Sequence, residues 1–346
     1  MSLAIGITGL SQAGKSTFFQ ALTSVADSDA SSRRGAPMAR VPVPDPRIWR
    51  LAEIFHPRKT TPSTIDFVDM PGGSSGGGLG AQALGEIRTA TALVEVVRCF
   101  EHPYLGGPDP QADMENFEME LTLADLKIVE GKLERRKKLQ PHEAEVLERL
   151  QVPLAAGDPA ALPVLTPEEQ KLTSGLGLLT LKPRIYAANL AEAEQGGASA
   201  LAQTVHRFAQ ARNTESIEAC ALLEAEIAQL AEEERQTFLR ELGIQESGLT
   251  KMVHAGNRRL GLLTFFTVGE DEVRAWTCPV GSTAPQAAGV IHSDLERGFI
   301  RAEVIDYEVF VECGSMTSAK AEGKLRVEGR DYLVQEGEIL TIRFNV

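Results

Sequence analysis

The sequence predicts an α/β fold: a doubly wound parallel sheet, an antiparallel helical arm inserted into it, and a small α+β domain at the C-terminus. Short apolar runs rich in β-branched residues alternate with helical patterns, a charged stretch with helical spacing interrupts them, and short alternating runs separated by glycines follow from residue 262. Alternating strands and helices are typical of parallel sheets with helices on both faces. The expected strands of that sheet are residues 3–7, 64–68, 92–97 and 184–188.

The first expected strand leads directly into a phosphate-binding pattern. Residues 9–16 read Gly-Leu-Ser-Gln-Ala-Gly-Lys-Ser, which fits G-x-x-x-x-G-K-[ST], and a helix-like run follows. In this pattern backbone N–H groups surround phosphates at a helix N-terminus, the lysine reaches the β- and γ-phosphate oxygens, and the last hydroxyl binds Mg²⁺. We therefore expect a nucleoside triphosphate to bind here. The expected binding residues are Ser11, Gln12, Ala13, Gly14, Lys15, Ser16 and Thr17.

A second strand end supplies a D-x-x-G sequence. Asp69 follows the expected strand 64–68, and Gly72 stands three residues later. In nucleotide switches such an aspartate holds Mg²⁺ and the glycine N–H senses the γ-phosphate. Ser16 and Asp69 are thus the expected metal site, with Mg²⁺ as the cofactor. Lys15 and Gly72 are the expected catalytic groups, because they would stabilise charge on the transferring phosphoryl group.

A third candidate binding segment, residues 189–192, follows the expected strand 184–188 and would decide which nucleotide base is bound. GTPases use N-K-x-D in this place, because the aspartate accepts hydrogen bonds from guanine N1–H and N2–H₂. Here Leu190 and Glu192 replace the lysine and the aspartate, which weakens guanine selection. Asn189 can still bond adenine N7 and N6, and Leu190 offers the ring an apolar contact. ATP is the expected ligand and GTP the alternative, while an ordinary polar loop after a strand is the remaining interpretation.

Residues 113–179 form the expected arm. Apolar residues at helical spacing between residues 113 and 150 predict two antiparallel helices that turn near Pro141, which suits the first turn of the second helix. Basic residues gather near the tip, and they are a candidate contact for a ribosome or RNA, or alternatively a solvated helix face. They are Lys132, Arg135, Arg136, Lys137 and Lys138.

The remaining sequence completes the expected domains. Residues 1–112 and 180–261 are assigned to the nucleotide-binding domain, with a further helical stretch over residues 216–242. Residues 262–346 are assigned to the small domain, whose segment 277–346 holds seven basic and eleven acidic residues, a balance that disfavours non-specific RNA binding. Its expected strands are residues 263–268, 303–311, 331–334 and 339–344.

Composition predicts a soluble cytoplasmic protein. The chain has 346 residues, 43% of them hydrophobic, and a formal net charge of −13. No apolar run approaches the roughly 18 residues of a membrane span, and no signal peptide is seen, so no membrane partner is expected. The four cysteines show no metal or disulfide spacing. An acidic surface repels nucleic acid in bulk, so no DNA is expected and RNA would need a local basic patch.

Together these motifs resemble the Obg-like ATPase family, also called YchF. The resemblance runs nearly end to end and includes a C-terminal TGS domain, which is ubiquitin-like in fold. It implies an ATP-preferring P-loop ATPase with a helical arm and a role near the ribosome, and it implies base contacts from Cys220, Ala221 and Leu222. The matching segments are residues 9–16, 41–47, 69–72, 78–80, 97–101, 189–192, 274–276, 284–289, 298–303 and 343–346.

The sequence also departs from the family pattern in its switches. Family members carry a Mg²⁺-binding threonine in the first switch, where this chain offers only Ser31 or Ser32. Gly73 occupies the place of a hydrophobic residue in a shortened second switch, and in the shortened loop after residue 101 the family's histidine is replaced by Pro103, with His102 beside it. We expect nucleotide binding to survive these changes better than turnover does.

Three functions are consistent with these residues. The first is an ATPase switch that turns over slowly, because no catalytic glutamine is visible. The second is a non-hydrolysing module in which the nucleotide orders a binding surface for a ribosome or protein partner. The third is a GTPase.

Overall fold

The chain forms two compact units in the computed structural model. The structure describes residues 3–26, 32–33, 36–72, 78–195 and 197–345. The first unit comprises Met1–Val41 and Asp66–Gly256, and the second comprises Pro42–Ile65 and Asn257–Val346. Residues 42–65, expected in the nucleotide-binding domain, therefore belong to the second unit. The expected arm, residues 113–179, lies within the first unit, and its standing as a separate domain stays a prediction.

A seven-stranded sheet forms the centre of the first unit, in the order β2-β3-β5-β1-β6-β7-β8. β1 pairs in parallel with β5 and β6, and β7 pairs in parallel with β6 and β8. The four strands expected for this sheet are confirmed. Their carboxyl ends share one edge, where ligands of such sheets bind. The strands are β1 (Ala4–Thr8), β2 (Ser32–Arg33), β3 (Ala36–Pro42), β5 (Thr64–Asp69), β6 (Ala92–Cys99), β7 (Arg184–Leu190) and β8 (Glu215–Ala219).

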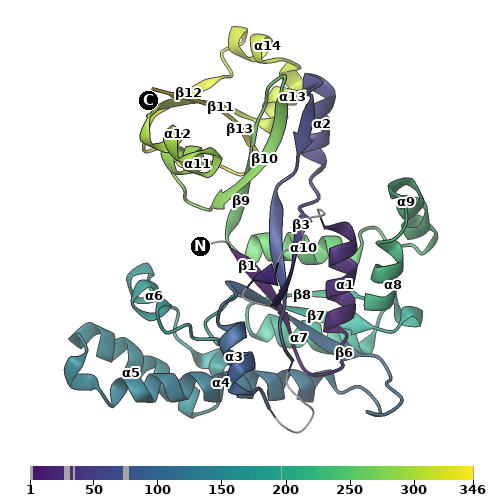
Figure 1. Cartoon of the computed structure of the whole chain (residues 1–346), viewed down its shortest axis with the longest axis vertical. Coiled ribbons are helices and arrows are strands. Elements are labelled where there is room, and N and C mark those ends of the chain that lie inside the picture. The colour runs from purple at the N-terminus through teal and green to yellow at the C-terminus, as the bar shows by residue number, and fades with distance from the viewer. Residues whose placement is uncertain (1–2, 27–31, 34–35, 73–77, 196, 346) are drawn as a thin grey trace. The chain divides into compact units, whose positions relative to one another are not determined.

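Helices cover both faces of this sheet (Figure 1). Successive residues of a strand point to opposite faces. Ala4 belongs to a buried cluster with Phe117 and Leu121 of α4, whereas Ile5 lies against Gly256 of α10, where an added Cβ would overlap the Ile5 side chain. The helices of this unit are α1 (Lys15–Val25), α3 (Ala81–Ile87), α4 (Pro110–Leu133), α5 (Pro141–Ala155), α6 (Pro167–Ser174), α7 (Ala200–Ala211), α8 (Ala221–Ile227), α9 (Glu232–Glu241) and α10 (Gly248–Arg259).

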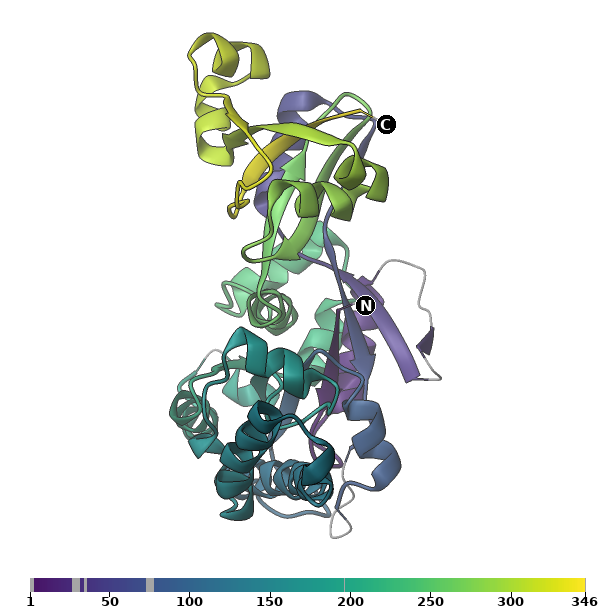
Figure 2. The same ribbon diagram turned by 90° about the vertical axis from the view of Figure 1, so that its left-hand side faces the viewer.

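The expected helical hairpin is confirmed. Figures 1 and 2 show α4 and α5 side by side, and they are joined by a short 3-10 turn, Arg136–Lys138. Pro141 is the first residue of α5, as predicted. Val129 of α4 and Leu150 of α5 are fully buried in the cluster that joins the two helices. The four basic residues 135–138 are exposed at the turn.

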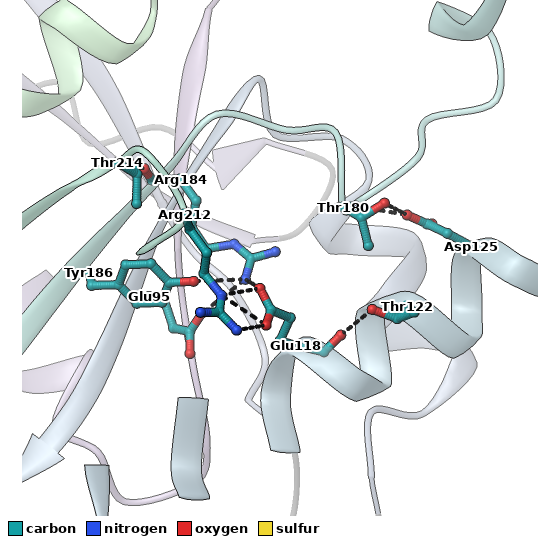
Figure 3. A network of polar contacts seen from close by, with 9 residues as sticks. All are labelled: Glu95, Glu118, Thr122, Asp125, Thr180, Arg184, Tyr186, Arg212 and Thr214. Atoms are coloured by element: carbon teal, nitrogen blue, oxygen red, sulfur yellow. Dashed lines mark hydrogen bonds and ion pairs between the residues drawn. The ribbon is translucent and has the colours of Figure 1, made fainter. Parts of the chain in front are cut away.

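Buried carboxylates on α4 hold it against the sheet (Figure 3). Glu118 accepts a hydrogen bond of 2.8 Å from Arg212 and lies 3.8 Å from Arg184, which in turn lies 3.4 Å from Glu95 of β6. Burial raises the pKa of Glu95 to about 8, although Arg184 opposes the rise. Two turns further on, Asp125 accepts from the Thr180 amide at 2.7 Å. Each buried charge thus has a partner, which the low dielectric of the interior demands.

The second unit is built on a six-stranded sheet in the order β12-β11-β13-β9-β10-β4. One face packs on α11 and α12, and the other packs on α2, α13 and α14. The strands are β4 (Lys59–Thr61), β9 (Leu262–Thr267), β10 (Glu272–Pro279), β11 (Phe299–Asp306), β12 (Arg326–Glu328) and β13 (Glu338–Phe344). The helices are α2 (Pro46–Phe55), α11 (Ala284–Ile291), α12 (Ser293–Arg297), α13 (Tyr307–Cys313) and α14 (Met316–Ala321).

Residues 42–65 join this unit for a packing reason. Ile48 and Leu51 of α2 are fully buried in one cluster with Phe266 and Phe310, and β4 pairs in parallel with β10. Sequence inspection missed both elements. A three-residue edge strand gives little periodic signal, but α2 carries one that was overlooked: Ile48, Leu51 and Phe55 lie at helical spacing after an Asp45-Pro46 start.

Three expected elements are wrong. Residues 216–219, expected to be helical, lie in the strand β8. Ile217 and Ala219 are buried and alternate with exposed or half-buried neighbours, and the strand pairs with β7. The expected strand 303–311 ends at Asp306, after which α13 packs Phe310 into the core. Residues 331–334 form only an isolated bridge between Leu333 and Thr283. Among the described residues, no helix is both long and apolar enough to cross a membrane.

Candidate nucleotide-binding site

The phosphate loop, residues 9–16, has the backbone that its sequence predicts. It joins β1 to α1, which begins at Lys15, and three of its residues have positive φ: Gly9 (130°), Gln12 (62°) and Gly14 (96°). An added Cβ would overlap the Val96 oxygen at Gly9 and the Asn189 amide at Gly14. The loop therefore requires glycine at both positions. It leaves the first N–H groups of α1 without a side-chain cap, an arrangement that suits an anion.

Lys15 and Gly72, the two predicted catalytic residues, lie next to each other. The Lys15 Nζ donates to the Leu10 oxygen at 2.6 Å, and the Lys15 side chain adjoins Gly72, where an added Cβ would overlap Nζ. Burial lowers the pKa of Lys15, and the nearby Asp69 carboxylate opposes this shift. Burial likewise raises the pKa of Asp69, against the attraction of Lys15. An arriving phosphate would give Lys15 a stronger partner than a neutral carbonyl.

Lys15, Asp69 and Gly72 line a cavity of about 430 Å³, which we call the second cavity. It is lined by both predicted metal ligands, Ser16 and Asp69, and by Lys15 and Gly72. Hydroxyl and carboxylate oxygens are ligands that Mg²⁺ accepts, and Mg²⁺ takes its remaining ligands from phosphates and water. The residues therefore fit this ion. The described residues contain no group of three or more His, Cys, Asp or Glu side chains that would hold a metal without a nucleotide. Ser31 and Gly73 lie outside the described residues, and for Ser32 only the backbone strand is described.

Asn189 ties two predicted segments together. Its side-chain nitrogen donates to the Ala13 oxygen at 2.8 Å, and its side-chain oxygen accepts from the Ala221 amide at 2.9 Å. Asn189 is 4% exposed. These two bonds use one N–H and one lone pair of the amide. Asn189 thus positions the phosphate loop and the start of α8, whatever else it contacts.

A larger cavity of about 680 Å³, which we call the first cavity, is lined by the phosphate loop, by residues after β7 and by the start of α8. Leu190 lines it but is also packed in the core with Val97 and Val205, so only part of its surface faces the cavity. Leu222 is 68% exposed and forms an open part of the wall. The predicted residues on its lining are Gln12, Gly14, Lys15, Ser16, Thr17, Asn189, Leu190, Glu192, Cys220, Ala221 and Leu222. Of the other two, Ser11 lines the second cavity and Ala13 is buried behind Asn189.

Sequence inspection did not predict one wall of the first cavity. The loop of residues 99–108, which follows β6, lines it, and so do Glu194 and Leu201. The signal that could have revealed the loop is its position at the carboxyl end of a central strand, where ligands of doubly wound sheets bind. Its lining residues are Cys99, Phe100, Glu101, His102 and Pro108.

Comparison with known proteins agrees with this architecture. A family model, YchF-GTPase_C, described as a protein of unknown function (DUF933), matches residues 262–345. The chain is 42% identical to the ribosome-binding ATPase YchF of Bacillus subtilis and 42% identical to that of Escherichia coli O157:H7, in each case over the full length of both proteins. Its structure is similar to that of the Schizosaccharomyces pombe YchF GTPase, with a TM-score of 0.89 and 29% identity over 99% of this chain and 98% of the other.

Proposed function

Because the chain belongs to the YchF family of P-loop proteins, we propose that it binds ATP with Mg²⁺ and hydrolyses it slowly to ADP and phosphate. One observation carries the proposal: the first and second cavities share Gln12, Lys15 and Ser16 among their lining residues. A triphosphate that runs along the start of α1 would thus extend from one cavity to the other. Its γ-phosphate would reach Asp69 and Gly72, and its base would lie near Asn189.

In this proposal Lys15 stabilises negative charge on the phosphoryl group while water attacks in line. Mg²⁺, held by Ser16 and Asp69, would supply further charge neutralisation. The Gly72 amide would donate a hydrogen bond to the γ-phosphate, and this bond would be lost after hydrolysis. In the sequence Gly73, not a glutamine, follows Gly72, and this supports slow intrinsic turnover.

ATP and GTP should be compared directly. We expect ATP to displace a fluorescent ATP analogue more strongly than GTP does, since Leu190 and Glu192 lack the guanine-selective pair. Phosphate release should be slow and should require Mg²⁺. Failure of the wild-type protein to bind either nucleotide would contradict the proposal. Preference for GTP would favour the GTPase alternative, and tight ATP binding without release would favour the non-hydrolysing module.

We further propose a ribosome as the partner, in the cytoplasm, because relatives that match the full chain are named ribosome-binding ATPases. The exposed turn between α4 and α5 is the candidate contact. Reversing the charges of Arg135, Arg136, Lys137 and Lys138 should abolish co-sedimentation with ribosomes while ATP affinity stays unchanged. Unchanged co-sedimentation would show that this turn is only a solvated surface.

A further inference from the structure

The loop of residues 99–108 is held in one conformation by a buried arginine. Arg98, near the end of β6, donates to the backbone oxygens of Phe100 at 3.2 Å, Gly106 at 3.0 Å and Gly107 at 3.2 Å. The Arg98 residue is only 8% exposed, and His102 and Gly106 form a β-bridge across the loop. A guanidinium that satisfies three carbonyl oxygens fixes both sides of a loop at once. The predicted phosphate chemistry does not use this loop.

The sheet register puts the loop beside the Asn189 segment. Arg98 pairs with Asn189, and Cys99 pairs with Leu190, so β6 and β7 reach the edge of the sheet together. Phe100, His102 and Pro108 line the first cavity, and none of them lines the second cavity, which holds Asp69 and Gly72. A triphosphate at the start of α1 would leave its sugar and base in the part of the first cavity that this loop lines.

The His102 ring has a defined hydrogen-bonding state. Its Nδ1 accepts from the Tyr104 amide at 3.2 Å. A neutral imidazole that accepts at Nδ1 carries its proton on Nε2 and can donate only from there. His102 is half-buried, whereas residues 103–107 are exposed. His102 is thus the one half-buried residue between residues 101 and 108, and it lines the first cavity.

We propose that Arg98 fixes residues 99–108 as a wall of the first cavity, and that His102 on this wall donates from Nε2 to the nucleoside part of the bound nucleotide. His102 is then a specificity-determining residue for the sugar and base, and Arg98 is a positioning residue that acts through it. The inference rests on the proposed nucleotide binding and adds to it the part of the ligand that this loop recognises.

The test separates nucleoside from phosphate recognition. Mg²⁺ complexes of ATP and of inorganic tripolyphosphate compete against a fluorescent ATP analogue, on the wild type and on His102→Ala. We expect the variant to bind ATP about three- to tenfold more weakly, as loss of one hydrogen bond predicts, and tripolyphosphate within twofold of the wild type. Equal loss for both ligands, or no loss for ATP, would overturn the proposal. If tripolyphosphate is too weak to compete, AMP must weaken by the same factor as ATP, and unchanged AMP binding would overturn the proposal.

Two further variants test the positioning role. Arg98→Lys keeps the charge but cannot reach three carbonyl oxygens, so it should weaken ATP binding to a similar extent, and the double variant with His102→Ala should be no weaker than either single one. Additive losses would show that Arg98 acts independently of His102. Tyr104→Phe, which alters a 91% exposed side chain of the same loop, is the matched control and should change nothing. A wild type that binds no ATP would instead contradict the proposed function.

Discussion

The two ends of the candidate site are built differently. The proposed phosphate end is built mainly from one continuous stretch, residues 9–16, whose backbone N–H groups and Lys15 would contact the phosphates, with Asp69 and Gly72 beside it. The proposed nucleoside end combines three segments from distant parts of the sequence. Asn189 bonds to the phosphate loop and to the start of α8, whereas Arg98 holds its own loop, residues 99–108. Phosphate recognition would therefore depend on local backbone conformation, whereas base recognition would depend on side chains from several loops.

The largest effect should come from the phosphate end. Lys15→Ala removes the cation that would face the β- and γ-phosphates, and the hydrolysis rate should fall by about 10²–10³-fold, as for other preorganised charge-stabilising groups. Phosphate release under saturating ATP would measure this. Lys127→Ala, at an exposed lysine of α4, is the control and should leave the rate unchanged. A rate unchanged in Lys15→Ala would rule out the assigned role of this lysine.

Gly14→Ala should break the phosphate loop itself. The residue has φ 96°, and a Cβ would overlap the Asn189 amide, so unfolding should become easier by roughly 2–4 kcal/mol. Thermal unfolding and ATP titration would both report the loss. Gly131→Ala in α4 is the matched control: nothing lies within 4 Å of its added Cβ, and it should stabilise the protein by about 0.5–1 kcal/mol. Equal effects at both glycines would contradict this account of the loop.

Asn189→Asp should weaken the link between the two ends. The carboxylate cannot donate to the Ala13 oxygen and would face it as a buried charge, so ATP affinity should fall by about 10–100-fold. Calorimetric titration would measure the affinity. Asn116→Asp, on the exposed surface of α4, makes the same chemical change without a buried partner and should bind ATP normally. Normal binding by Asn189→Asp would show that the bridge is dispensable.

The smallest effect on binding should come from Glu95, which lies in the buried network beneath α4. Burial raises the pKa of Glu95 to about 8, against an ordinary value of 4.5. The folded state therefore favours the protonated form, and the stability that this gives is complete below pH 4.5 and is lost as the pH rises through about 8. Between these values the unfolding free energy should fall by up to about 1.4 kcal/mol per pH unit.

Glu95→Gln should flatten that pH dependence and leave ATP affinity unchanged. Denaturant unfolding at several pH values would measure the slope. An identical slope in the variant would mean that another group titrates in this range. A large loss of ATP affinity would mean that the network supports the nucleotide site as well as the arm.

Sequence patterns predict the backbone of the phosphate loop, because a strand, a glycine-containing loop and a helix follow one another in consecutive residues; phosphate binding there stays a prediction. The positive φ values at Gly9 and Gly14 explain why the motif has glycine at both positions. The other end is less predictable: His102 lines the first cavity because β6 and β7 end together and Arg98 holds the loop, and of this the sequence reveals only that the loop follows a central strand. The expected strand 303–311 failed for a related reason, since its alternating apolar residues suit a strand as well as the short helix that packs Phe310.

One nucleotide should span both ends of the site, and a crystal structure with Mg²⁺ and a non-hydrolysable ATP analogue tests this most directly. We predict phosphates at the start of α1, with Lys15 Nζ moved from the Leu10 oxygen to the β- and γ-phosphates and the metal on Ser16. The base should lie among Asn189, Leu222 and the loop of residues 99–108. A base bound outside the first cavity, or Lys15 still bonded to Leu10, would contradict the account.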